Sequence, residues 1–345
     1  MRGFLPNGCL VRFIFAQTRL KVLLLAALAG LLGASPAVGQ TKSLEDLVSS
    51  VVRLKTSINP NGRTVDGLGH ARDGSGIVID DNGLILTIGY LMVEANTAEV
   101  ITNDGRTVPA TVVGYDHETG FGLVRALQPL KIKPIAFGKS GDLKERDPVI
   151  AASHGGVRGV APAYVVARRE FAGNWEYLVD GAIFTAPAHS DWSGAALINR
   201  EGKLVGVGSL IVGDATGKGD SVAGNMYVPT DLLMPILADL IANGRIAGAG
   251  HPWLGLTTNE VHGRLFVARV TPGSPAEKAG IARGDIIVGV NGQAPSGMAD
   301  FYRKLWAQGG AGVTVPIDVL QGTETKRLEI QTINRLDHLR LKTTF

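Results

Sequence analysis

The segment GSGIVIDDNGLILT, residues 74–87, decides the fold class because it contains two short apolar runs separated by a tight-turn sequence. Asp81-Asn82-Gly83 between the runs is typical of a β-hairpin turn, and Asn103-Asp104-Gly105 is a second signal of the same kind. Further short apolar or alternating runs follow at residues 111–114, 148–151 and 203–207. Many short strands at this spacing indicate a mostly β fold, either a barrel or a sandwich.

A second segment, DWSGAAL at residues 191–197, resembles the turn that carries the nucleophilic serine of chymotrypsin-like proteases. The resemblance is to the HtrA/Deg family of periplasmic proteases, whose turn reads GNSGGPL and whose histidine lies in a pattern GSGxIIxxxGxILTNxHV that residues 74–87 fit. It implies a mostly β fold, a chymotrypsin-like double β-barrel followed by an α+β PDZ domain. It also implies a homo-oligomer, a trimer as in the family.

Three positions that matter for catalysis in this family hold other residues here. The histidine pattern continues with Tyr90, which therefore stands where the catalytic base belongs. The family's aspartate closes a pattern DxxTDLA, and residues 116–122 read DHETGFG, which puts Gly120 at the aspartate. Asp191 stands at the turn glycine two residues before the nucleophile position, Ser193. The resemblance thus implies a degenerate catalytic triad.

These replacements remove the chemistry that a serine nucleophile needs. A serine hydroxyl becomes reactive when an imidazole takes its proton and a carboxylate orients that imidazole. A phenol with a pKa near ~10 is not a base at neutral pH, and the carboxylate of Asp191 would repel a developing oxyanion. We therefore expect Ser193 to be a turn residue without activity. The alternative is residual hydrolysis, with His189 or His117 replacing the base.

The second half of the chain reads as a helix, a linker and a smaller domain. A helix is expected over residues 231–242, with Thr230 as N-cap and Gly244 as terminator, followed by a Gly/Ala-rich linker at residues 244–250. In the family, such a helix and linker join the protease body to a PDZ domain. Residues 270–280, VTPGSPAEKAG, then combine a turn with a short capped helix, as PDZ domains do.

The expected peptide-binding residues lie in two parts of this domain. The WLGL segment resembles the carboxylate-binding loop of PDZ domains, in which the N–H groups of Leu254, Gly255 and Leu256 form a concave nest and the next strand accepts a peptide. Met298 and Phe301 begin an apolar stripe at helical spacing that walls the groove. The alternatives are core packing for the stripe and an ordinary turn glycine at Gly255.

The N-terminus is typical of an export signal. An uncharged apolar run at residues 22–32 follows four basic residues, and small residues lead to a cleavage site before Gln40. An uncleaved inner-membrane anchor is the alternative, since the run extended to residue 39 approaches the ~20 residues of a bilayer span. Without residues 1–39 the chain has 30 Lys+Arg against 31 Asp+Glu, so its formal charge changes from +3 to −1. The only cysteine, Cys9, lies in the signal.

We therefore expect a signal peptide (1–39), a trypsin-like protease-fold domain (40–243), a linker (244–250), a PDZ domain (251–335) and a tail (336–345). The composition gives no sign of a metal site, a cofactor or nucleic-acid binding. The favoured function is a periplasmic pseudoprotease that binds exposed C-termini or unfolded segments through its PDZ domain, in quality control or as regulator of an active protease relative. The alternatives are an active serine endopeptidase and a structural subunit of mixed oligomers.

The tail carries one further expectation. It ends in Thr343-Thr344-Phe345, and a hydroxyl at the third-last position with a large apolar terminus suits one common PDZ specificity class. Docking of this tail into a PDZ groove is one interpretation, and a frayed end is the other.

Overall fold

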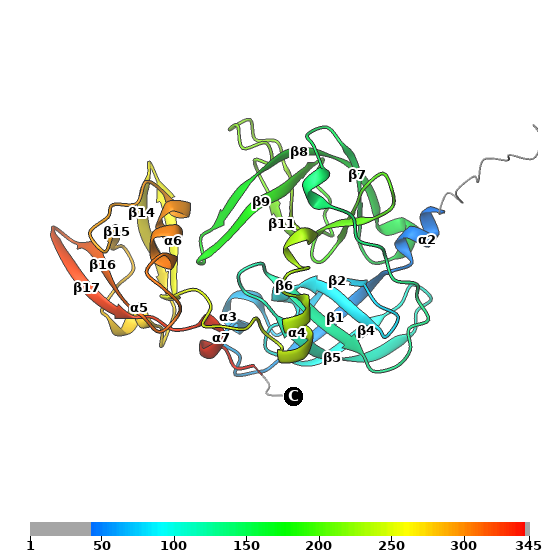
Figure 1. Cartoon of the computed structure of the whole chain (residues 1–345), viewed down its shortest axis with the longest axis horizontal. Helices are drawn as coiled ribbons and strands as arrows, with labels where there is room; N and C mark the ends of the chain where they lie inside the picture. The colour runs from blue at the N-terminus through cyan, green and yellow to red at the C-terminus, as the bar shows by residue number, and fades with distance from the viewer. Residues whose placement is uncertain (1–42, 342–345) are drawn as a thin grey trace, which may run out of the picture. The chain divides into compact units, whose positions relative to one another are not determined.

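The computed structural model describes residues 43–341. The expected signal peptide at residues 1–39 and the end of the tail, Thr343 to Phe345, lie outside the described residues. The expected fold class is confirmed: two closed β-barrels are followed by a five-stranded sheet with helices (Figure 1).

The first barrel has the strand order β1-β2-β3-β6-β5-β4, and every pairing is antiparallel. Its two predicted hairpin turns connect β2 to β3 and β4 to β5, and Gly83 and Gly105 in them have φ values of 75° and 87°. These left-handed conformations suit glycine because it has no Cβ. The strands are β1 Val51–Ile58, β2 Ala71–Val78, β3 Leu84–Ile88, β4 Ala95–Ile101, β5 Thr107–Tyr115 and β6 Phe121–Ala126.

The second barrel has the order β10-β11-β12-β9-β8-β7, again with antiparallel pairings. Its longest hairpin joins β8 to β9, and the three residues 174–176 form the turn between them. The strands are β7 Pro148–Ala152, β8 Val160–Gly173, β9 Tyr177–Ala186, β10 Ala196–Ile198, β11 Leu204–Val212 and β12 Gly224–Pro229. One buried apolar cluster includes side chains from both barrels, for example Leu86, Phe121 and Phe184.

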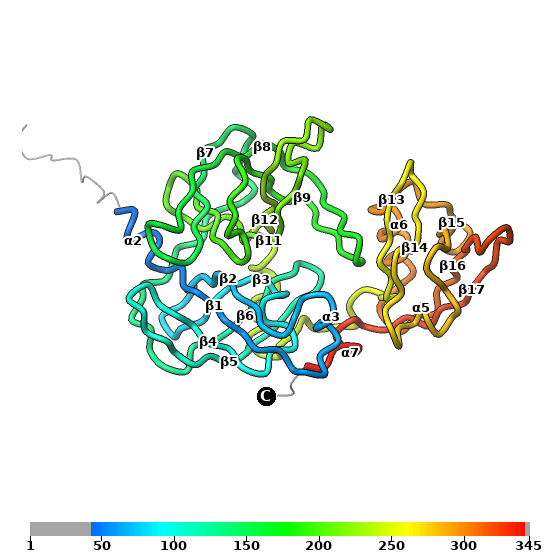
Figure 2. The backbone as a smooth tube through the Cα atoms, turned by 180° about the vertical axis from the view of Figure 1, so that it is seen from behind, coloured from blue at the N-terminus to red at the C-terminus, as the bar shows by residue number. Residues whose placement is uncertain are grey.

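The C-terminal domain is a sheet of order β13-β14-β15-β16-β17 with helices α5 and α6, and β13 is an edge strand (Figure 2). Its core contains Phe301, Tyr302 and Leu305 from α6. The strands are β13 Leu256–Val261, β14 Arg264–Val270, β15 Ile286–Val290, β16 Thr314–Gln321 and β17 Glu324–Gln331.

The α-helices of the described chain are α2 Leu44–Val48, α3 Val65–Leu68, α4 Leu237–Asn243, α5 Pro275–Lys278, α6 Met298–Trp306 and α7 Arg335–His338. The 3₁₀ helices are η1 Gly89–Leu91, η2 Ser140–Asp142, η3 Gly156–Gly159 and η4 Thr230–Leu232.

The prediction of a helix over residues 231–242 is wrong in its first half. The chain instead forms η4 and then α4, and Thr230 makes no helix-capping bond with its side chain. Pro235 explains the break, since a proline lacks the N–H that a helix interior needs and disfavours helical conformation in the preceding residue. Gly244 does end the helix: its φ is 72° and its N–H donates to the carbonyl of Leu240. No helix within residues 43–341 is long and apolar enough to cross a membrane.

Glu94 fastens the C-terminal segment to the first barrel. Its carboxylate, on a residue only 2% exposed, accepts hydrogen bonds from the N–H groups of Arg63 (3.0 Å), Thr64 (2.8 Å) and Arg340 (2.7 Å). Burial alone would raise the pKa of Glu94, but hydrogen bonds from Thr64, Arg340 and Arg63 outweigh it and the pKa lies below its ordinary value. The first residues of the expected tail are therefore part of the folded structure.

We expect Glu94→Gln to lower the free energy of unfolding at pH 7 by about 1–3 kcal/mol, because it removes charge-assisted acceptors from buried N–H groups. A lowered carboxyl pKa gives stability that is complete above the ordinary glutamate value and is lost as the pH falls through the folded-state value. The difference between wild type and variant should therefore shrink below pH 4 in urea denaturation. Glu99→Gln, at an exposed position on β4, is the control. A difference that is independent of pH would contradict this account.

Candidate functional site

Ser193 lies in the turn before β10, where the two barrels meet. The N–H of Ser75, on β2, donates to the carbonyl of Ser193 over 2.8 Å, and the N–H of Gly194 donates to the carbonyl of Gly208 over 2.9 Å. Gly194 has a φ of 71°, and a Cβ there would lie 2.0 Å from the carbonyl oxygen of Ser75. The turn therefore requires glycine after Ser193, and the close backbone contact fixes the serine against the first barrel.

Tyr90 contacts Ser193 directly. Tyr90 lies in η1, immediately after β3, and its Oη is 2.9 Å from Ser193 Oγ. The same Oη donates its proton to the carbonyl of Ser209 over 2.8 Å. Because a phenol has one proton, Ser193 is the donor in the Tyr90–Ser193 hydrogen bond.

The phenol of Tyr90 is a poor base for the proton of Ser193. Burial raises the pKa of Tyr90 to about 12, and the hydrogen bond from Ser193 opposes this only in part. At pH 7 the phenolate fraction is then on the order of 10⁻⁵. The arrangement holds the serine hydroxyl in place without deprotonating it.

A backbone hydrogen bond joins Gly120 to the segment that carries Tyr90. It has a φ of 82°, and its carbonyl accepts from the N–H of Gly89 over 2.7 Å. The phenol of Tyr177, the first residue of β9, fills the space beside it: a Cβ on Gly120 would lie 3.0 Å from Tyr177 Oη. That hydroxyl donates to the carbonyl of Thr119 over 2.7 Å. A side chain at Gly120 would thus meet both backbone strain and an occupied site.

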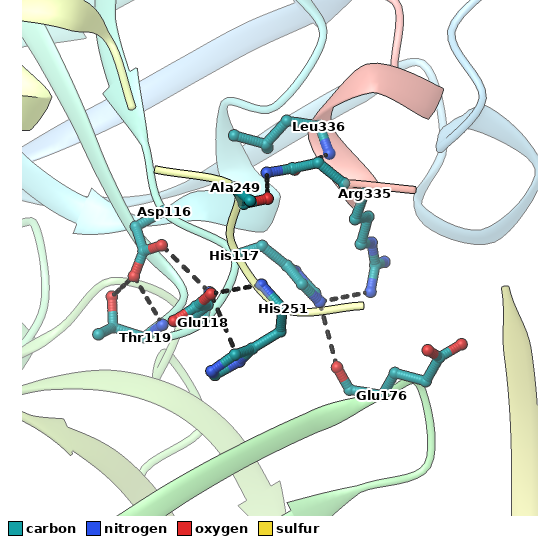
Figure 3. Close-up of polar contacts among 10 residues, drawn as sticks. Asp116, His117, Glu118, Thr119, Glu176, Ala249, His251, Arg335 and Leu336 are labelled. Carbon is teal, nitrogen blue, oxygen red and sulfur yellow. Dashed lines mark hydrogen bonds and ion pairs between the residues drawn. The ribbon is translucent and has the colours of Figure 1, made fainter. Parts of the chain in front are cut away.

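The two histidines considered as replacement bases are held elsewhere. Arg335 lies 2.7 Å from His117 Nε2, and the carbonyl of Glu176 lies 3.3 Å from the same nitrogen (Figure 3). The other ring nitrogen, Nδ1, lies 3.0 Å from Tyr115 Oη. Burial, aided by Arg335, lowers the pKa of His117 well below its usual value. The backbone of His189 is bound by the side chain of Asn225. All seven histidines lie within residues 43–341, and none of them hydrogen bonds to Ser193 there.

His154 is a neighbour of the site that the sequence reasoning did not include. Its ring nitrogen Nδ1 is 3.2 Å from Ser75 Oγ, and its backbone N–H donates to the same oxygen over 3.0 Å. Burial lowers the pKa of His154, and Arg53 lowers it further.

Asp191 is exposed and lies outside the left-handed backbone region. Within the described residues, no group of three or more His, Cys, Asp or Glu could hold a metal ion.

The expected carboxylate loop holds a carboxylate of the chain itself. The N–H groups of Leu254, Gly255 and Leu256 donate to the side chain of Glu176 over 2.8, 2.7 and 2.7 Å. Gly255 has a φ of 89°, and a Cβ there would lie 2.2 Å from Ser274 Cβ, so the loop conformation requires glycine. Three convergent amides of this kind form an anion-binding nest.

A groove of about 910 Å³ lies between the edge strand β13 and the start of α6. Met298 lines it, together with Thr258 and Glu260 from β13 and Ala172 and Asn174 from the β8–β9 hairpin. Phe301, which we expected to line the groove, is fully buried in the core of the C-terminal domain instead. The helix turns this side chain inward, toward the sheet, as the core-packing interpretation of the stripe implied.

Comparison with known proteins shows which families the two parts of the chain resemble. Residues 74–207 match the trypsin-like peptidase domain, and residues 266–327 match the PDZ domain. The putative serine protease HhoA of Synechocystis sp. is 30% identical over 276 residues, covering 72% of this chain and 67% of that protein. The periplasmic pH-dependent serine endoprotease DegQ of Escherichia coli is 27% identical over 260 residues, 71% of this chain and 56% of that protein. The chain belongs to the HtrA/Deg family.

The fold is shared with a solved structure, the HtrA-type protease AlgW with decapeptide. The two chains are 21% identical with a TM-score of 0.51, and the match covers 87% of this chain and 100% of that one. The chain spans about half the length of some curated relatives that it matches: 56% of DegQ and 53% of a probable periplasmic serine protease of Haemophilus influenzae.

The tight site around Gly120 predicts a difference between two glycine substitutions. Gly105→Ala and Gly120→Ala impose similar backbone strain, since φ is 87° and 82°, but a Cβ on Gly105 meets nothing within 4 Å. We expect Gly105→Ala to cost about 1 kcal/mol of unfolding free energy, and Gly120→Ala to cost about 1–2 kcal/mol more through its contact with Tyr177. Urea denaturation measures both. Equal losses would show that Tyr177 leaves room for a side chain.

Proposed function

We propose that this HtrA/Deg-like protein has lost proteolytic activity and binds C-terminal or unfolded peptide segments through its PDZ domain. We place it in the periplasm, where it would act in protein quality control or regulate an active protease relative, as an oligomer. Periplasmic serine proteases among its relatives support this location. The PDZ match supports peptide binding.

One observation carries the loss of activity: the group within hydrogen-bonding distance of Ser193 Oγ is the phenol of Tyr90, and the serine donates to it. Serine attack on a carbonyl needs a group that takes the hydroxyl proton at neutral pH. A phenol that keeps its own proton up to about pH 12 does not take it. The loss of an orienting carboxylate at Gly120 acts in the same direction.

The purified protein should not cleave casein, nor react with a fluorophosphonate probe, above the level of its Ser193→Ala variant. Escherichia coli DegQ is the positive control for both assays. Serine-dependent turnover tenfold or more above the variant would support the alternative function, an active endopeptidase. Labelling that rises about tenfold per pH unit between pH 8 and pH 10 in the wild type, but is lost in Tyr90→Phe, would identify the Tyr90 phenolate as the base in that case.

Tyr90→Phe separates a structural role of the phenol from a chemical one. The substitution leaves the carbonyl of Ser209 and the hydroxyl of Ser193 without their partner, so we expect a loss of about 1–3 kcal/mol in unfolding free energy. We expect no change in the background rate with casein. Tyr164→Phe, on the exposed face of β8, is the matched control and should be neutral. A stable Tyr90→Phe variant with a lower rate of Ser193-dependent hydrolysis would contradict the proposal.

A further inference from the structure

The tip of the β8–β9 hairpin lies in the peptide groove of the PDZ domain. Its last residue, Glu176, places a side-chain carboxylate on the amide nest of residues 254–256, where a peptide ligand would place its terminal carboxylate. Two residues earlier, the carbonyl of Asn174 accepts a hydrogen bond from the N–H of Thr258 over 2.9 Å. The tip thus makes both a carboxylate contact and a backbone contact.

The backbone contact falls on a strand that has an open edge. β13 pairs with β14 on one side only, so its outer N–H and C=O groups are available to a further strand. Thr258 lies two residues after Leu256, the last residue of the nest, and both N–H groups donate to the tip. This is the pattern of β-strand addition, with main-chain pairing next to a captured carboxylate.

Helix α6 holds the tip from the other side of the groove. Tyr302 Oη donates to the carbonyl of Gly173 over 2.7 Å and accepts from the N–H of Glu176 over 3.2 Å. Arg303 forms ion pairs with two residues of the hairpin strands, Glu170 and Asp180. Contacts with both walls of the groove therefore hold the tip at its two ends.

Glu176 itself carries the marks of a constrained residue. It is 4% exposed, and its φ of 58° lies in the left-handed region that disfavours residues with a Cβ. Burial raises the pKa of its carboxyl, although the three amides and Arg335 act in the opposite direction. Strained backbone and a buried carboxylate persist only where surrounding contacts offset their cost, and such sites are often functional.

We propose that residues 173–176 are a built-in ligand of the PDZ groove, which an external C-terminus must displace before it binds. The proposal rests on the peptide-binding function proposed above. It concerns how that site is regulated. Only molecules whose amide nest is free bind peptide, so the fraction of such molecules sets the apparent affinity. Displacement would also move Tyr177, the neighbour of Glu176, from its contact beside Gly120.

The test uses the purified chain and two variants, with Glu99→Gln on β4 as control. Glu176→Gln keeps the shape of the side chain and removes its charge. Glu176→Gly removes the side chain and also relieves the positive φ, so it guards against a folding defect. The first measurement is hydrogen exchange at the amides of Leu254, Gly255 and Leu256. The second is fluorescence anisotropy with a labelled pool of decapeptides that end in valine, leucine or phenylalanine, offered as free acids or as C-terminal amides.

We expect the three amides to exchange at least tenfold faster in both variants, and the free-acid pool to bind at least tenfold more tightly than to wild type and the control. The amidated pool should gain less. Unchanged exchange together with unchanged affinity would overturn the built-in ligand. Faster exchange without peptide binding to any of the proteins would support occupation of the nest by Glu176 and overturn the proposed peptide-binding function.

Discussion

A buried carboxylate must find hydrogen-bond donors or lose its charge, and this requirement at Glu176 ties the second barrel to the PDZ domain. The hairpin brings the acid and the glycine loop brings the amides, and each group satisfies the other through three hydrogen bonds. Around this contact the aromatic residues Trp175 and Tyr177 stack with centroids 5.5 Å apart, and Arg335 donates to the carbonyl of Trp175 over 2.9 Å. The position of Tyr177 next to Gly120 follows from the same turn.

The Ser193 site shows how a serine can be retained in a protease-like turn while its hydroxyl is held by a phenol. Tyr90 uses its proton on the carbonyl of Ser209 and its oxygen on Ser193, so one side chain joins η1 of the first barrel to two segments of the second. The backbone contact between Ser75 and Ser193 adds to this connection. The residues at the nucleophile and base positions of the family, Ser193 and Tyr90, therefore make contacts that join the two barrels.

The sequence was sufficient for the fold class, but it did not reveal His154 beside Ser75 or the occupant of the groove. Alternating apolar runs and glycine turns are local signals, and they predicted the hairpins at Gly83 and Gly105. The broken helix near Pro235 was also a local matter, and weighing that proline would have corrected the expectation. Glu176 is different: an acid in a turn between two strands is ordinary, and its partners lie about 80 residues further along the chain. Such a pairing depends on tertiary structure, which no single-sequence pattern encodes.

The segments that enter and leave the PDZ domain lie side by side. Trp253 and Ile333 form an antiparallel bridge, and the side chain of Asn334 donates to the carbonyl of Ala249 over 2.8 Å. The N–H of His251 is bound by Glu118 of the first barrel, while Glu94 binds the exit segment at Arg340. A movement of the domain that frees the groove must therefore bend both segments or break their hydrogen bonds to the first barrel.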